Sequence, residues 1–260
     1  MTDQVQPESI LRIKDLSVYF GGLGALLRCS IDVYRGEIRG VIGPNGAGKT
    51  TLFNVISRFY KPVEGEIRFE DLNLLSFKPH QIIKLGISRT FQKSDLFGSM
   101  SALENVQMGM HIHMKTNLLS ASVHLRSMKE DERRSREEAL KILEMLSLAD
   151  YAKQPASVLP LGKQRLLEIG RAIASRPKLL LLDEPASGMT YAEKSELVDM
   201  LFRIREEMNL TLLLVEHDMR MVMRISDRLT VLNYGQIIAQ GDPEQVRNDR
   251  LVIEAYLGSE

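Results

Sequence analysis

The sequence has a single cysteine and no tryptophan, and it lacks both an excess of charge and a long apolar run. Cys29 is the only cysteine among the 260 residues, which excludes an internal disulfide. Basic and acidic residues number 34 each, so no net field attracts nucleic acid or anionic lipid. Apolar runs such as residues 179–182 are far shorter than the roughly 20 residues that cross a bilayer. The first ten residues also lack the basic and apolar regions of a signal peptide, and we expect a cytosolic protein.

The sequence does contain enough apolar residues, 44%, to fill a sizeable core. Its first third predicts a sheet, because short apolar or alternating runs are separated by turn residues such as Gly21-Gly22 and Glu64-Gly65. The predicted strands are residues 11–20, 27–34, 37–42 and 66–69.

The rest of the chain predicts helices and further strands. Residues 101–150 have helical periodicity and include a charged run, 129–138, which we expect to be a solvated helix face. Later, apolar strands alternate with helices, and this alternation predicts a parallel sheet with helical crossovers. These elements are strands 179–182 and 211–215, helices 164–174 and 192–207, a hairpin of 228–232 with 236–239, and a short helical tail.

The strongest motif is GPNGAGKT, residues 43–50, which has the spacing of a Walker A phosphate loop between a predicted strand and a helix. Glycines let backbone N–H groups curl around phosphate, and a helix N-terminus adds a positive dipole. We expect Lys49 to bind the β- and γ-phosphates of ATP and Thr50 to ligate Mg²⁺. The predicted nucleotide-binding residues here are Gly43, Asn45, Gly46, Ala47, Gly48, Lys49, Thr50 and Thr51.

A pair of carboxylates, Asp183 and Glu184, directly follows the apolar run 179–182. This order puts them at the carboxyl end of a buried parallel strand, where α/β folds bind ligands. Asp183 is then placed to hold Mg²⁺, directly or through water. Glu184 is the candidate to polarise the water that attacks the γ-phosphate.

With these motifs, the chain resembles the ATP-binding cassette proteins along nearly its whole length. The resemblance implies a P-loop NTPase core with an antiparallel β subdomain and an inserted helical subdomain. It implies that Phe20 stacks on adenine, although its neighbour Tyr19 could take that role. Gln92, in the stretch Arg-Thr-Phe-Gln, is similar to the glutamine that senses Mg²⁺ and the attacking water. His217 is similar to the histidine that hydrogen-bonds the γ-phosphate.

The family's signature loop, LSGGQ, corresponds to Leu-Pro-Leu-Gly-Lys, residues 159–163, of which only the first and fourth match. In the family this loop caps ATP on a second cassette, so Gly162 is predicted to contact the partner's nucleotide. Pro160 offers neither a hydroxyl nor an N–H to that nucleotide. Lys163 either brings a positive charge to the same phosphates or is solvated. Thr190 stands where the family usually has aspartate. We therefore expect a normal helix after Pro160 but a weak half-site.

Several stretches resemble the ATP-binding subunits of branched-chain amino acid importers, among them Phe-Gly-Gly-Leu at 20–23 and Gly-Asp-Pro-Glu-Gln-Val at 241–246. The resemblance implies an ATPase that powers uptake of branched-chain amino acids or a related small solute. It would be peripheral on the cytoplasmic face of the membrane and dock on separate permease subunits. A second cassette, identical or different, would pair with it head to tail, and an external solute-binding protein would act indirectly.

This assignment has two alternatives. A soluble ATPase acting on nucleic acid or ribosomes would normally have two fused cassettes or long coiled-coil insertions, and this chain has one cassette and no net charge. A largely non-hydrolytic regulatory cassette paired with an active partner fits the altered signature loop. We expect one nucleotide-binding domain over residues 1–260, with a helical subdomain at about 93–165 and a C-terminal helical tail at about 241–260.

Overall fold

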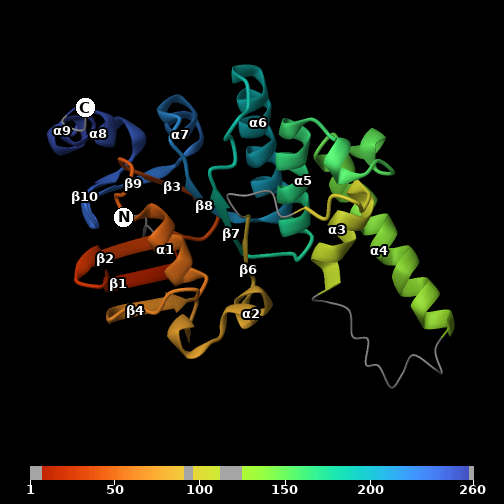
Figure 1. Ribbon diagram of the computed structural model, residues 1–260, viewed down its shortest axis with the longest axis horizontal. Coiled ribbons are helices and arrows are strands. Elements are labelled where there is room, and N and C mark those ends of the chain that lie inside the picture. Colours follow the sequence, from red (N-terminus) through yellow and green to blue (C-terminus); the bar gives the residue numbers. More distant parts are fainter. Residues whose placement is uncertain (1–7, 91–95, 112–124, 258–260) are drawn as a thin grey trace, which may run out of the picture.

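The chain folds into two β-sheets and a group of helices (Figure 1). This computed structural model describes residues 8–90, 96–111 and 125–257. One sheet is antiparallel, with strand order β2-β1-β4-β5. The other has the order β10-β9-β3-β8-β7-β6, and all its pairings are parallel except that of β10 with β9. The predicted α/β class is confirmed.

The antiparallel sheet forms from the first third of the chain, as predicted. Its strands are β1 (Ser9–Phe20), β2 (Leu23–Tyr34), β4 (Glu64–Phe69) and β5 (Leu72–Asn73). Gly21 and Gly22 make the β1–β2 turn at φ 57° and 114°, values that glycine adopts without strain. Because this turn is tight, β2 begins at Leu23, four residues earlier than its apolar pattern predicts.

The central strands of the six-stranded sheet are buried and largely apolar on both faces. Its strands are β3 (Ile38–Ile42), β6 (Ile87–Arg89), β7 (Leu179–Asp183), β8 (Thr211–Val215), β9 (Arg228–Asn233) and β10 (Gln236–Gly241). In β7, Leu180 and Leu182 pack in one hydrophobic cluster while Leu179 and Leu181 pack in the other. A strand buried on both faces has no polar alternation, which explains the continuous apolar run.

The helices cover both faces of this sheet. They are α1 (Lys49–Ile56), α2 (Pro79–Ile82), α3 (Ala102–Met110), α4 (Leu125–Met145), α5 (Leu161–Ile173), α6 (Tyr191–Met208), α7 (Met219–Ile225), α8 (Pro243–Arg247) and α9 (Arg250–Leu257). Helix α1 shares one core with the antiparallel sheet, and α3 to α7 share the other. Figure 1 places α8 and α9 at the opposite end of the molecule from α4.

The predicted helical region contains two separate helices, α3 and α4, which pack on each other and on α5. The charged run lies on α4 and is largely solvated: Arg133 and Arg134 are exposed and pair with Glu137 and Glu138 one turn later. Strand β6 was not predicted, because three residues are too few to show a period of two.

Gly109 marks the closest approach of α3 and α5 and generates a stability prediction. A Cβ at Gly109 would lie 2.0 Å from the carbonyl oxygen of Arg171. Alanine improves helix propensity by about 1 kcal/mol, but overpacking against backbone costs about 1–3 kcal/mol and usually more than offsets that gain. We expect Gly109→Ala to lower the free energy of unfolding by about 1–2 kcal/mol in urea titration.

Gly98→Ala is the matched control for this prediction. The nearest atom to a Cβ at Gly98 is the Cβ of Ser157, at an ordinary 3.4 Å. This variant should unfold at the wild-type urea concentration. Equal urea midpoints of unfolding for the two variants would show that α3 and α5 can move apart without loss of stability.

Candidate active site

The phosphate loop joins β3 to α1 and depends on its glycines. Gly43, Gly46 and Gly48 have φ values of 149°, 77° and 108°, all in the range that disfavours side chains. A Cβ at Gly43 would lie 2.0 Å from the carbonyl oxygen of Leu232, so β9 packs directly against the start of the loop. Gly48 is the N-cap of α1, which directs the first N–H groups of that helix into the loop.

The Lys49 ammonium is held inside this loop. Its Nζ donates hydrogen bonds to the carbonyl oxygens of Gly43, at 2.6 Å, and Pro44, at 2.9 Å. Burial lowers the pKa of Lys49 below its usual value, and the nearby carboxylates of Glu184 and Asp183 partly oppose that shift. An ammonium whose hydrogen bonds go to carbonyl oxygens is a ready partner for a phosphate oxygen, which accepts stronger, charge-assisted hydrogen bonds.

A cavity of about 660 Å³ opens in front of the loop. It brings together residues from five segments: the start of β2, the phosphate loop with the first turn of α1, the turn after β7, the turn after β8, and the β9–β10 turn. Among its lining residues are Asn45, Gly46, Ala47, Gly48, Lys49, Thr50, Thr51, Glu184 and His217, all of them predicted from the sequence.

Glu184 and His217 face each other at this cavity. The Nε2 atom of His217 lies 2.9 Å from Oε1 of Glu184, within hydrogen-bond distance. They meet because β7 and β8 are adjacent parallel strands, paired to the end at Asp183 and Val215. Glu184 has φ 49°, a left-handed conformation that is costly for a residue with a side chain. Its N–H donates to the carbonyl oxygen of Val215, which holds it there.

Glu216 connects the two turns that carry Glu184 and His217. It is buried, and its Oε1 accepts a hydrogen bond from the N–H of Ala186 at 2.7 Å. Its Oε2 accepts from the N–H of His217 at 3.0 Å. One carboxylate thus ties the turn after β7 to the turn after β8 and fixes their spacing. Sequence reasoning gave Glu216 no role, since its contacts depend on how two distant turns meet.

Asp183 forms an ion pair through one carboxylate oxygen, and its other oxygen has no partner among the described residues. Its Oδ2 forms an ion pair of 2.7 Å with Arg89, and both side chains are buried. Its buried Oδ1 has no hydrogen-bond partner among the residues that the structure describes. Arg89 also donates to Oδ1 of Asn54 at 2.8 Å and lies over the ring of Phe53. Arg89 therefore links β6, α1 and β7.

The signature loop lies away from this cavity. Helix α5 begins at Leu161, as predicted, with Pro160 as its N-cap and no side-chain cap. Gly162 is buried, and a Cβ there would lie 2.5 Å from Oε1 of Glu193 on α6. It is not among the residues that line the cavity. The start of α5 lies on the helical side of the parallel sheet, opposite α1 (Figure 1). This loop does not complete the chain's own site.

Thr190, which stands where the family usually has aspartate, caps helix α6. Its hydroxyl caps α6 by accepting a hydrogen bond from the N–H of Glu193, whose side chain in turn accepts from the N–H of Thr190. The pKa of Glu193 is lowered first by that backbone hydrogen bond, then by the Thr190 hydroxyl, and also by Lys163. Lys163 thus has a carboxylate neighbour within its own chain.

Four predicted site residues that the structure describes are not among those that line this cavity: Phe20, Gly43, Gly162 and Asp183. Phe20 is 46% exposed, and its ring packs edge-on against Tyr60 with centroids 5.1 Å apart. Leu23, Gly24 and Ala25 of β2 line the cavity instead. Stacking of Phe20 on adenine therefore stays a prediction. Gln92 lies outside the described residues, so its role stays a prediction as well.

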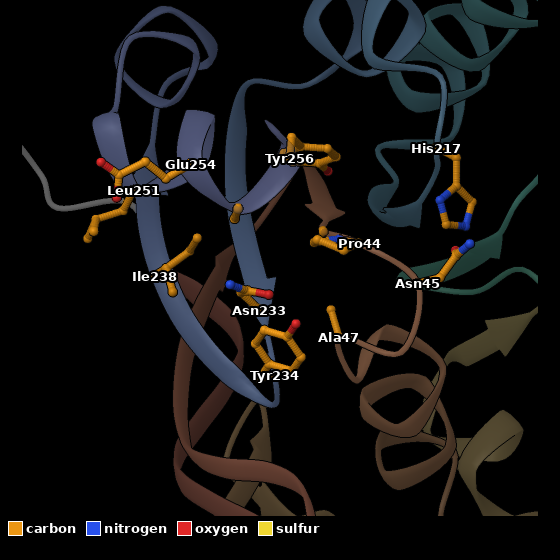
Figure 2. Close-up of a pocket in the computed structure, with 12 residues that line it drawn as sticks. Pro44, Asn45, Ala47, His217, Asn233, Tyr234, Ile238, Leu251, Glu254 and Tyr256 are labelled. Atoms are coloured by element: carbon orange, nitrogen blue, oxygen red, sulfur yellow. The ribbon is translucent and has the colours of Figure 1, made fainter. Parts of the chain in front are cut away.

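A second cavity, of about 710 Å³, adjoins the first across the phosphate loop (Figure 2). The two share Asn45, Ala47, His217 and Tyr234. Its far wall is α9, from which Tyr256 points toward Pro44. The sequence pattern of the tail predicts a helix but does not predict that its tyrosine lies beside the phosphate loop.

Comparison with known proteins agrees with this geometry. The ABC transporter family model matches residues 26–187. A second model, described as a branched-chain amino acid ATP-binding cassette transporter, matches residues 236–260. The chain is 42% identical over 251 residues to the high-affinity branched-chain amino acid transport ATP-binding protein LivG of Escherichia coli K12, covering 96% of this chain and 98% of that protein.

Further relatives and a solved structure give the same result. BraF of Pseudomonas aeruginosa, a protein of the same description, is 41% identical over 249 residues, covering 96% of this chain and 98% of BraF. A crystal structure of an ATP-binding cassette of an ABC transporter, in its ADP conformation, superposes with a TM-score of 0.83 at 34% identity, covering 96% of this chain and 99% of that one. The chain belongs to the ABC transporter family, as one of its ATP-binding cassettes.

Proposed function

We propose that this cassette binds and hydrolyses ATP to power uptake of branched-chain amino acids through separate membrane subunits. The observation that carries the proposal is the meeting of Lys49, Glu184 and His217 at one cavity. The relatives at 41% and 42% identity, which match nearly the whole chain, support the choice of solute.

The chemistry follows from the positions of these side chains. Backbone N–H groups of the loop and the Lys49 ammonium bind the phosphates. Glu184 accepts a proton from water as the water oxygen bonds to the γ-phosphorus, and the bond from that phosphorus to the leaving oxygen of ADP breaks. His217, 2.9 Å from Glu184, orients that carboxylate and can hydrogen-bond the γ-phosphate. The products are ADP and inorganic phosphate.

The donor set also fits Mg²⁺. The ion prefers oxygen ligands, and the buried Oδ1 of Asp183 and the hydroxyl of Thr50 are available to it, with Gln92 a third candidate. Among the described residues no cluster of three or more His, Cys, Asp or Glu could chelate an ion alone, so phosphate oxygens and water would supply the remaining ligands. Bound there, Mg²⁺ would neutralise charge on the β- and γ-phosphates.

Assembly with a second cassette is part of the proposal. The signature loop at Gly162 lies away from the chain's own cavity, so a head-to-tail partner would bring its signature loop to that cavity and receive this one in return. No helix among the described residues is long and apolar enough to span a bilayer. We infer that the cassette docks on permease subunits at the cytoplasmic face of the membrane, with a solute-binding protein acting on the other side.

The altered signature loop favours a second candidate function, that of a largely non-hydrolytic regulatory cassette. Pro160 has no N–H, and its side chain makes no capping hydrogen bond to α5. In a dimer, this loop would stabilise the partner's nucleotide poorly. The chain's own cavity, however, carries Glu184 and His217 together, which a regulatory cassette does not need.

Lys49→Ala tests the phosphate loop. The methyl group cannot replace an ammonium whose charge-assisted hydrogen bonds are worth about 1.5–3 kcal/mol each, so affinity for ATP should fall at least about tenfold. Titration with a fluorescent ATP analogue measures this. Lys141→Ala removes an exposed ammonium from α4 and should bind as the wild type does. Wild-type affinity in Lys49→Ala would refute the phosphate role of the loop.

Glu184→Gln separates hydrolysis from binding and decides between the two functions. The amide keeps the size of the carboxylate and its reach to His217 but cannot take a proton, so turnover should slow about 10²-fold or more while ATP still binds. An ATP-loaded dimer should then accumulate in size-exclusion chromatography. Glu196→Gln, an exposed change on α6, is the control. If the wild type turns over no faster than Glu184→Gln, the regulatory function is the correct one.

Transport itself is tested with the cassette purified together with its membrane subunits. Reconstituted in vesicles with the binding protein, the complex should accumulate radiolabelled leucine only when ATP faces the cassette. The Glu184→Gln complex should not accumulate it. ATP-dependent uptake of an amide or urea but not of leucine would refute the solute class and leave the ATPase intact.

A further inference from the structure

Arg89 reaches from the end of β6 to Asp183, the carboxylate proposed to bind Mg²⁺. Its Nη2 atom donates to Oδ2 of Asp183 at 2.7 Å, and the two side chains are only 9% and 2% exposed. This arginine opens the Arg-Thr-Phe-Gln stretch, in which the glutamine is the residue predicted to act. Arg89 takes no part in the proposed reaction itself, but a buried ion pair at a metal ligand constrains that ligand.

The guanidinium of Arg89 is fixed by helix α1. Its Nη1 atom donates to Oδ1 of Asn54 at 2.8 Å, and its Cζ atom lies 5.5 Å from the centroid of the Phe53 ring. A guanidinium is planar and holds two acceptors in fixed directions at once, which a flexible ammonium does not. Since α1 also carries Thr50, the arginine ties the carboxylate of Asp183 to the helix of the other candidate metal ligand.

The backbone of Asp183 is held separately, by the residue after Arg89. The N–H of Asp183 donates to Oγ1 of Thr90 at 3.3 Å, and the N–H of Thr90 donates to the carbonyl oxygen of Leu181 at 3.0 Å. These bonds fix the main chain at the end of β7, but the last side-chain torsion of an aspartate has broad preferences and lets the carboxylate turn. The ion pair with Arg89 removes that freedom.

The ion pair occupies one carboxylate oxygen of Asp183 and leaves the other for a cation. Oδ1 is buried and has no hydrogen-bond partner among the described residues, whereas Oδ2 accepts from the guanidinium. Carboxylates that bind metals in proteins are usually oriented by a hydrogen bond from an outer partner, and loss of that partner typically weakens metal binding about 10–100-fold. Arg89 has the position of such an outer partner.

We propose that Arg89 is a positioning residue for the metal ion of the nucleotide site, which holds Oδ2 of Asp183 against α1 so that Oδ1 stays available to Mg²⁺. The proposal rests on the proposed function, because the ion is expected to bind together with the nucleotide. Arg89 acts through Asp183 and touches neither the ion nor the phosphates.

The charge of Arg89 alone would have the opposite effect on metal binding. A guanidinium beside a carboxylate opposes the approach of another cation, so its removal would tighten metal binding if charge decided the outcome. Orientation predicts weaker binding, since a released carboxylate can turn toward the Lys49 ammonium, with which it interacts electrostatically. We expect orientation to prevail, because a buried carboxylate is costly to leave unpaired and Lys49 offers it a partner.

Arg89→Met, which keeps a long side chain without its charge, tests this with Mn²⁺ as the probe. Mn²⁺ is titrated into protein saturated with ADP, and the bound ion is measured by electron paramagnetic resonance. The Kd for Mn²⁺ should rise about tenfold. Arg89→Lys restores the charge but not the two fixed hydrogen bonds, so it should still bind Mn²⁺ more weakly than the wild type does. Wild-type or tighter binding in Arg89→Met would overturn the proposal.

Arg39→Met is the matched control for the loss of a buried arginine. Arg39, on β3 of the same sheet, pairs with Glu37 at 3.0 Å, with side-chain exposures of 3% and 9%. Breaking either buried pair should lower the melting temperature. The Kd for Mn²⁺ should stay within about twofold of wild type in Arg39→Met. Equal weakening of Mn²⁺ binding in the two variants would show a purely structural role and overturn the proposal.

Asn54→Ala keeps both members of the ion pair, so it tests the proposal without breaking a buried charge pair. It removes the acceptor that fixes the guanidinium, and the Kd for Mn²⁺ should rise about threefold. In the double variant with Arg89→Met, the Asn54 change should have no further effect, because residues that act through one contact are not additive. An unchanged Kd in Asn54→Ala would overturn positioning through α1, as would additive effects in the double variant.

The readouts also distinguish this proposal from the proposed function. Binding of Mn²⁺ with ADP requires no turnover, so a wild type that binds both but does not hydrolyse ATP would refute the ATPase and leave the role of Arg89 to be decided by the Kd values for Mn²⁺. A wild type that binds ADP without Mn²⁺ would refute the metal site and the role of Arg89 together, and leave nucleotide binding intact.

Discussion

Burial of both faces of the parallel sheet is the constraint on which the site depends. Strands that are largely apolar on each side place most of their polar groups at their ends, and parallel strands end at one edge. Because β3, β8 and β7 are neighbours in that sheet, the segments that follow them meet there. Those segments are the phosphate loop, the turn with His217 and the turn with Glu184. The order of the strands thus brings the functional side chains together, although the three segments are far apart in the sequence.

The features that could be predicted from the sequence are those that local pattern determines. The apolar run 179–182 predicts a strand buried on both faces, and its carboxylates therefore lie at the sheet edge. The phosphate loop is predictable because its glycines are needed at φ values that other residues avoid. Three-residue β6 and the ion pair of Arg89 with Asp183 were missed, since both depend on which strands become neighbours. The contact of Phe20 with Tyr60 was missed for the same reason.

The departures from the family motif leave intact the two helices that follow them. Thr190 caps α6 through the same kind of hydrogen bond that an aspartate would make, so the helix after the altered loop starts normally. Pro160 occupies the N-cap of α5, where its missing N–H is not required by the helix. In the proposed head-to-tail assembly, the N–H and hydroxyl that Pro160 lacks would affect the nucleotide of the partner cassette.

The groups that would meet ATP are all incompletely satisfied within the chain itself. The Lys49 ammonium donates its hydrogen bonds to carbonyl oxygens of its own loop, and its pKa is lowered by burial. Asp183 has one oxygen without a partner among the described residues, and Glu184 sits at a left-handed φ. Such arrangements lower stability by amounts that the surrounding core must offset. They persist because Glu216 and Arg89 hold these segments in place from outside the cavity. A triphosphate would accept hydrogen bonds from the Lys49 ammonium, and its metal ion would bind the unpartnered oxygen of Asp183. Contacts that are missing in the folded chain would then form on binding, and they would contribute to the free energy of ATP binding.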